Sequence, residues 1–575
     1  MASLVELVEP LPLRFERECF LLSDTQVANV DAALASCSRQ LRSLVNSRAA
    51  VNCLPPEILK LIFDHVVVHR WLRMAFEPAW TSEYLSLDPS NYSSVIPATT
   101  QVCRYWRGLA LRTPSLWRIL DPTAPIELRD LLFERSAGAQ LTVNVSYDVS
   151  PWLKSKLISD CGRVKELSAQ ALRASQVVDL VDFPAPMLQI ASVEQSRRRQ
   201  LGSAELLLFR GDAPRLFRLF LMNITWRPIN AFGSLAQLYL RNCKWSQPLR
   251  SLAQLLCATP NLVDLVLHQM DVVADDTDIN IPRARLVKLE RLTLTLTSST
   301  AIRNVLKIVQ LGSQTSVSMY GDPHAARDPH ILDDIRISKG MINDAPYKFY
   351  LQHNLARAGK AHCILAGTSS AILCENMSID VSENSVRLGE VDYYAFGFPQ
   401  EADTSSIRDA WIIEPDKDDD DDLGFFPEDM LNFLRRLANV ESLTMLSPTF
   451  SLFTAALALS PTPDACKRLS SMHILFYGSS SAPALVLESL AADQDLHVRN
   501  VTIGYLPGFK NDRVFMTEFD AYFDSVEYVS YTQVPRMDLP PTCTVDPHSF
   551  WPQWPLSSWT REIEKVAGLS RRRMG

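Results

Sequence analysis

The chain has 575 residues and a formal net charge of −8 at pH 7, with 47% hydrophobic and 21% charged residues. This composition is ordinary for a globular protein, and the length allows more than one domain. The acidic balance argues against a non-specific nucleic-acid binder, because such proteins are normally basic. No run of about eighteen apolar residues occurs, so we expect neither a membrane-spanning helix nor a membrane partner.

The eleven cysteines include no C-x-x-C pair, and the nearest two, Cys363 and Cys374, lie eleven positions apart. Such scatter is typical of reduced thiols and not of a disulfide or zinc framework. The first residues also lack the basic-then-apolar order of a signal peptide. We therefore expect a cytoplasmic or nuclear location.

Residues 1–50 are expected to form a helical region. Ser23 followed by Gln26 fits a capping box that starts a helix. Beyond it, apolar side chains recur at alternating three- and four-residue steps, as in a heptad seam: Val27, Val30, Leu34, Cys37, Leu41 and Leu44. The seam predicts either a self-associating coiled coil or a helix packed on the module that follows. We favour packing, because three heptads with a cysteine in the seam are marginal alone.

The stretch from Leu54 to Phe63 predicts the next helix. Pro55 and Pro56 suit its first position, where no N–H is needed, and Glu57 in the first turn is favoured by the helix dipole. At about 100° per residue, the apolar positions that follow make one wide face: Ile58, Leu59, Ile62, Phe63, Val66 and Val67.

A second stretch, residues 101–117, has the same character. Pro114 is expected to end its helix, and Ser115 to cap a short third one. The apolar positions of these two helices are Val102, Cys103, Trp106, Leu109, Ala110, Leu116 and Trp117.

Together the two stretches resemble the F-box, in the form common in mushroom-forming fungi. The first matches its Leu-Pro-x-Glu-Ile-Leu-x-x-Ile-Phe opening, and the second its Val-Cys-x-x-Trp-Arg-x-Leu-Ala-x-x-Thr-Pro-x-Leu-Trp close. The resemblance covers roughly residues 51–120. Phe63 and Cys103 lie 40 positions apart, which is farther than in a minimal F-box.

The resemblance implies a helical module that docks on the Skp-type adaptor of an SCF-type cullin–RING ubiquitin ligase. The rest of the chain would hold an unknown protein substrate, so the chain would be a substrate-recognition subunit and not an enzyme. An alternative is a repeat-based interaction scaffold that acts outside the ligase. The residues implied in adaptor binding are Leu54, Pro55, Ile58, Leu59, Ile62, Phe63, Val102, Trp106, Leu109, Leu116 and Trp117.

After a break at 121–125, residues 126–575 carry a recurring apolar-x-x-apolar-x-apolar pattern. It begins at Leu235, Leu262 and Leu289, 27 residues apart, and returns at spacings of 29, 29 and 28 from Val440 through Leu469 and Val498 to Val526. These periods lie in the leucine-rich-repeat range of about 20–29 residues. The predicted fold class is α/β: an N-terminal helical F-box module followed by an irregular leucine-rich-repeat solenoid.

Within one repeat, strand alternation predicts Leu265 and Leu267 in the core, with Asp264 and Val266 facing solvent. Residues 320–400 break the period. There we expect a helix over 341–358 and a strand over 372–381.

No nucleotide-binding, serine-hydrolase or zinc-protease motif occurs. His65 and His69 have the spacing of a helical metal pair but lack a third ligand. The acidic run 416–422 predicts a solvated loop, and Trp551, Trp554 and Trp559 are candidates to cap the last repeat. We therefore expect no catalytic residue, metal or cofactor.

Overall fold

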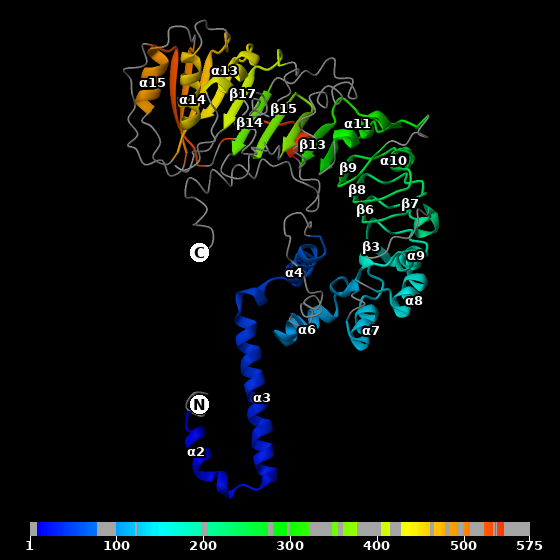
Figure 1. Ribbon diagram of the computed structural model, residues 1–575. Helices are drawn as coiled ribbons and strands as arrows, with labels where there is room; N and C mark the ends of the chain where they lie inside the picture. The colour runs from blue at the N-terminus through cyan, green and yellow to red at the C-terminus, as the bar shows by residue number, and fades with distance from the viewer. Residues whose placement is uncertain are drawn as a thin grey trace, which may run out of the picture. The chain divides into compact units, whose positions relative to one another are not determined.

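The structure is a computed structural model of all 575 residues (Figure 1). It describes residues 9–76, 99–120, 124–146, 148–196, 205–273, 280–295, 299–320, 348–354, 360–375, 404–413, 427–459, 465–477, 483–492, 498–506, 522–532, 535 and 537–544. The chain divides into two compact units, Met1–Asn144 and Val145–Gly575. None of the helices in the described part is long and apolar enough to cross a membrane.

The first unit is mainly helical and continues past the predicted break at 121–125 to Asn144. Its short strand β1 pairs in parallel with β2, which places Ile119 opposite Thr142 and Leu120 opposite Val143. The elements are α2 (Leu11–Glu18), α3 (Asp24–Arg48), η2 (Ala50–Cys53), α4 (Pro56–Phe76), α6 (Arg104–Leu111), the 3-10 helix η4 (Pro114–Trp117), β1 (Ile119–Leu120), α7 (Ile126–Arg135) and β2 (Leu141–Ser146).

Helix α3 begins with the predicted capping box. The Ser23 hydroxyl accepts from the Gln26 N–H at 3.4 Å, and the Gln26 side chain accepts from the Ser23 N–H at 2.9 Å. The expectation that α3 packs along the following module is wrong, because none of its 25 residues is buried. Its C-terminal end is held instead by local bonds, such as that from the Asn52 side chain to the Asn46 carbonyl at 2.6 Å.

The second unit contains a large, mostly parallel sheet. Hydrogen-bonded neighbours run β3–β4–β6–β8–β9–β11–β13–β16–β15–β14–β17–β18–β19–β20–β21. Only the pairs β16–β15 and β15–β14 among these are antiparallel. The strands are β3 (Val164–Leu172), β4 (Ile190–Gln195), β6 (Arg218–Met222), β8 (Gln237–Arg241), β9 (Asp264–His268), β11 (Arg291–Thr295), β13 (Ser316–Tyr320), β14 (Lys348–Asn354), β15 (Lys360–Ala366), β16 (Ala371–Glu375), β17 (Asp409–Ile413), β18 (Ser442–Leu446), β19 (Ser471–Phe476), β20 (Asn500–Tyr505) and β21 (Ser525–Ser530).

Helices lie between many of these strands along the chain. Leu252 lies in α10 and Phe453 in α14, and both side chains are fully buried. The helices are α8 (Pro151–Ser159), α9 (Ala174–Val181), α10 (Pro248–Cys257), α11 (Ser299–Ile308), α13 (Pro427–Arg436), α14 (Ser447–Ala458), α15 (Pro483–Ala492) and α16 (Pro541–Thr544).

The periodic strands are found where the pattern predicts them. In register, Leu265 of β9 faces Leu238 of β8 on one side and Leu292 of β11 on the other. These leucines are fully buried, so the 27-residue spacing stacks equivalent side chains in one continuous core.

Three predictions in this unit are wrong. Residues 348–354 form strand β14 instead of a helix, because they pair with both β15 and β17. In the last repeat the pattern predicted Val529 opposite Val501, but the register aligns Val526 with Val501. The predicted alignment is therefore wrong by three residues. That strand has apolar side chains in both phases, Tyr528 in one and Val529 in the other, so the pattern alone could not choose. The predicted strand 372–381 is confirmed for the part within β16.

The third error concerns β9. Asp264 and Val266 do lie on the face opposite Leu265 and Leu267, but both are fully buried instead of facing solvent. The register places Val266 between Tyr239 and Thr293, which are themselves almost fully buried. Neighbouring strands about 4.8 Å apart leave little water access between such side chains.

Candidate docking surface

The residues implied in adaptor binding divide into a core group and an exposed group, with Leu54 and Trp106 half-buried between them. Five of them belong to the core of the first unit and are at most 3% exposed: Leu59, Phe63, Leu109, Leu116 and Trp117. Side chains this deeply buried hold the helices of the module together, and a partner could contact them only after the module opened.

Aromatic side chains connect the helices of this core. The rings of Phe63 on α4 and Trp106 on α6 lie 4.8 Å apart between centroids, within the range of favourable aromatic pairs. The Trp106 indole N–H donates to the Asn52 side-chain oxygen at 2.5 Å, and the Trp117 indole N–H donates to the Ala110 carbonyl at 2.8 Å. Both tryptophans are therefore fixed at their polar and apolar ends.

The exposed group lies along the outer side of α4. Pro55 and Ile58 are exposed, as is Ile62, while Leu54 is half-buried. Leu61 is 63% exposed on the same side, although the family motif did not single it out. At about 100° per residue, Ile58, Leu61 and Ile62 lie together on one part of the wide apolar face, and Leu59 and Phe63 lie beside them, roughly 130° farther around the helix. The start of α4 is thus apolar over a wide arc, and the described residues bury the part with Leu59 and Phe63 while leaving Ile58, Leu61 and Ile62 exposed.

Near the start of α6, Val102 is 57% exposed, and Tyr105 is also exposed. Both line an open cavity of about 480 Å³ between α3 and this turn. Three arginines also line that cavity, Arg39 and Arg42 from α3 and Arg104 from α6. The motif predicted Val102 here, and its second stretch also contains Arg104, whereas Arg39 and Arg42 come from a helix that the motif does not include.

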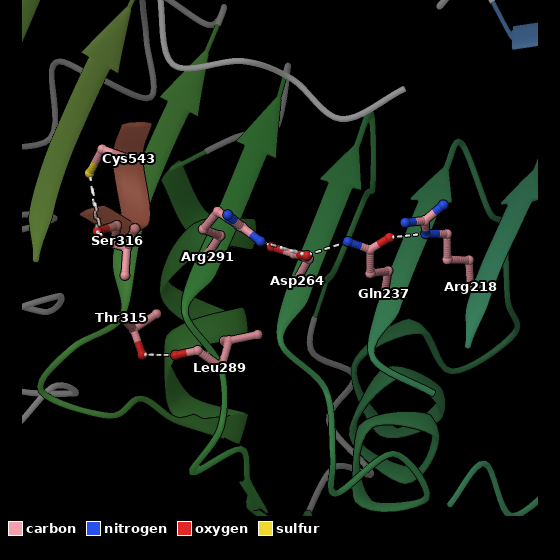
Figure 2. Close-up of polar contacts among 9 residues, drawn as sticks. Arg218, Gln237, Asp264, Leu289, Arg291, Thr315, Ser316 and Cys543 are labelled. Atoms are coloured by element: carbon pink, nitrogen blue, oxygen red, sulfur yellow. Dashed lines mark hydrogen bonds and ion pairs between the residues drawn. The ribbon is translucent and has the colours of Figure 1, made fainter. Parts of the chain in front are cut away.

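In the second unit, polar side chains cross the sheet on the face opposite the leucines. Figure 2 shows the Asp264 carboxylate between Gln237 and Arg291. The Gln237 amide donates to it at 2.6 Å, and the Arg218 Nε donates to the Gln237 side-chain oxygen at 2.5 Å. Strand register aligns Ser316 with Arg291, so this row of polar side chains on neighbouring strands continues onto β13.

The chain's own C-terminal segment covers the continuation of this face. The Cys543 thiol donates to the Ser316 hydroxyl at 3.3 Å, and the Thr542 hydroxyl lies 2.7 Å from it. Farther along the sheet, Met537 belongs to a buried apolar cluster with the strand residues Tyr350, Ile364, Leu373, Trp411, Ile413, Leu446 and Leu475. We call residues 531–544, as far as the structure describes them, the C-terminal strap.

The strap begins at Tyr531, whose hydroxyl lies 3.1 Å from the His473 Nε2. Burial lowers the pKa of His473 to about 4. A neutral imidazole is therefore the form that meets the phenol at neutral pH.

Metal chemistry finds no support among the described residues, where no three His, Cys, Asp or Glu side chains gather. His65 is exposed, while the side chain of His69, residues 416–422 and the tryptophans 551, 554 and 559 lie outside the described part. No family model matches the chain, and no curated protein matches it.

Proposed function

We propose that this chain is an F-box substrate-recognition subunit. Its first unit would dock on the Skp-type adaptor of a cullin–RING ubiquitin ligase, and its second, leucine-rich-repeat-like unit would hold the target protein. Ubiquitin transfer would then be carried out by partners, and this chain would contribute proximity, by raising the effective concentration of the target.

The observation that carries the proposal is the uncovered apolar side of α4. Ile58 and Ile62, which the two-part motif identifies, are 42% and 37% exposed, beside the more exposed Leu61. A contiguous exposed apolar patch is typical of a protein-interaction site. The same motif also accounts for Leu59 and Phe63, which shape the module from inside.

Target binding would fall to surfaces of the second unit that remain accessible. Around Val266 the polar face is buried, and farther along it is covered by the strap. Loops at the strand ends are better placed to contact a target, since loops carry binding residues in many folds of this type.

The test is a pull-down of a purified Skp-type adaptor with the full chain and with Ile58→Asp/Ile62→Asp. Each new carboxylate would have to be desolvated in an apolar interface, so we expect adaptor binding to fall by more than about tenfold. The matched control is Ile126→Asp, because Ile126 is another exposed isoleucine, at 52%, on α7 of the same unit.

The original motif residues offer a second variant, Leu54→Ala/Pro55→Ala, which should also weaken adaptor binding. Unchanged binding in both variants, with the control behaving as wild type, would show that the docking surface is misassigned. A chain that binds no adaptor at all would instead favour the scaffold that acts outside the ligase.

A further inference from the structure

We propose that α3 joins two copies of this chain as an antiparallel two-stranded coiled coil. The seam of this helix comprises Val27, Val30, Leu34, Cys37, Leu41 and Leu44. Several of its members are strongly exposed, with Leu41 at 56% and Leu44 at 51%. This inference does not depend on the docking function proposed above, because it involves a different helix.

The seam lies on the side of α3 that points away from the rest of its unit. The cavity beside α6 is lined by Arg39, Arg42, Ser43 and Asn46 of α3. At 100° per residue these four positions cluster on one side, and the seam positions cluster about 180° away. The described residues of the unit therefore bury none of the seam side chains.

A second copy is the occupant that the charges of α3 favour. All its charged residues are segregated: Asp24 and Asp31 lie in the N-terminal half, and Arg39, Arg42 and Arg48 in the C-terminal half. Two such helices side by side in the same direction would align like charges. In opposite directions, the acidic half of each would meet the basic half of the other.

The spacing of the seam fits the same orientation. In an antiparallel pair the layers would be Val27 with Leu44, Val30 with Leu41, and Leu34 with Cys37 of the partner copy. Every layer then contains at least one leucine or two large apolar side chains. The helix is about 38 Å long at 1.5 Å per residue, so the bulky modules at its C-terminal ends would lie well apart.

The first experiment is sedimentation velocity of the full chain over a range of concentrations, with Leu34→Asp/Leu41→Asp as the test variant. We expect a concentration-dependent dimer whose dissociation constant rises more than about tenfold in the variant, because the carboxylates would have to enter the seam. The control is Ala32→Asp, an exposed position on the opposite side of α3. Circular dichroism shows whether each variant keeps its helix content.

The second experiment determines orientation by disulfide cross-linking. Val27→Cys mixed with Leu44→Cys should give a cross-link between the two different variants, identified by mass spectrometry, whereas Val27→Cys alone should not link to itself. Salt should also weaken the dimer, because the Debye length falls from about 10 Å at 0.1 M to about 3 Å at 1 M.

A chain that stays monomeric at every concentration would overturn the proposal. So would a dimer that tolerates Leu34→Asp/Leu41→Asp as well as it tolerates Ala32→Asp. Self-linking of Val27→Cys without the mixed product would overturn the antiparallel arrangement.

Discussion

The carboxylate of Asp264 on β9 binds the guanidinium of Arg291 on β11 through two hydrogen bonds. One comes from Nε and the other from a terminal nitrogen at 3.0 Å. The Asp264 side chain is fully buried and that of Arg291 is 9% exposed. The two residues are register partners one repeat apart, so the periodicity of the chain is what brings the ion pair together.

Breaking this ion pair should be costly. Asp264→Ala leaves a buried guanidinium without its carboxylate, and we expect the free energy of unfolding to fall by roughly 3–5 kcal/mol. The double variant Asp264→Ala/Arg291→Met removes both charges and should lose less than the sum of the two single variants. Urea melts of the wild type, the two single variants and the double variant form a double-mutant cycle. If the losses of the single variants simply add up in the double variant, the two residues are not coupled.

Val266 should behave as a core residue. Val266→Ala removes two buried carbon groups at about 0.8 kcal/mol each, so we expect a loss of about 1.5 kcal/mol plus a cavity contribution. The control is Val287→Ala, because Val287 is 77% exposed, and its change should stay within about 0.5 kcal/mol. Equal, small effects in denaturant melts would show that the face around Val266 is open to water.

The second unit should lose stability in mild acid. Burial lowers the pKa of His473 to about 4, and burial together with the charge of Arg241 lowers the pKa of His268 to about 4. In the unfolded chain both titrate near 6.5, so only the unfolded state takes up these protons between pH 6.5 and 4. The contribution that the two neutral imidazoles make to the free energy of unfolding is therefore complete above about pH 6.5 and is lost as the pH falls toward 4.

One pKa unit corresponds to roughly 1.4 kcal/mol, so His473 accounts for at most on the order of 3 kcal/mol. His473→Gln should flatten this pH dependence in urea melts at pH 7, 6 and 5. His65→Gln, on an exposed residue of the first unit, should leave it unchanged. An unaltered slope in His473→Gln would contradict the assignment.

Gly504 should be needed where the strap starts. A Cβ at this position would lie 2.6 Å from a Leu475 methyl and 2.8 Å from the Tyr531 ring, which is closer than side chains tolerate. We expect Gly504→Ala to destabilise by roughly 1–3 kcal/mol. Gly108→Ala offers the opposite control, because Gly108 lies in α6 with open space around it and should gain roughly 0.5–1 kcal/mol. Thermal melts show whether each variant is more or less stable than the wild type. An unchanged stability of Gly504→Ala would mean that the Tyr531 ring does not pack against Gly504.

The sequence by itself determined the elements that rest on local or periodic signals. The capping box of α3 was predictable because Ser23 and Gln26 bond within one turn. The periodic strands were predictable because a repeat cannot bury its leucines alone, so the spacing itself encodes the stacking. The wide apolar face of α4 was also predictable from its spacing, although not which part of that face the unit would bury.

Only the tertiary structure decided the rest. Whether Val266 meets water depends on Tyr239 and Thr293, which are distant in the sequence and come together through strand register. Residues 348–354 became a strand because two neighbouring strands offered hydrogen bonds that a helix would leave unused. The strap lies on the sheet through contacts such as Cys543 with Ser316, 227 residues apart, and no local pattern reports such a separation. Local propensity sets what a segment can form, and long-range burial selects which of those forms persists.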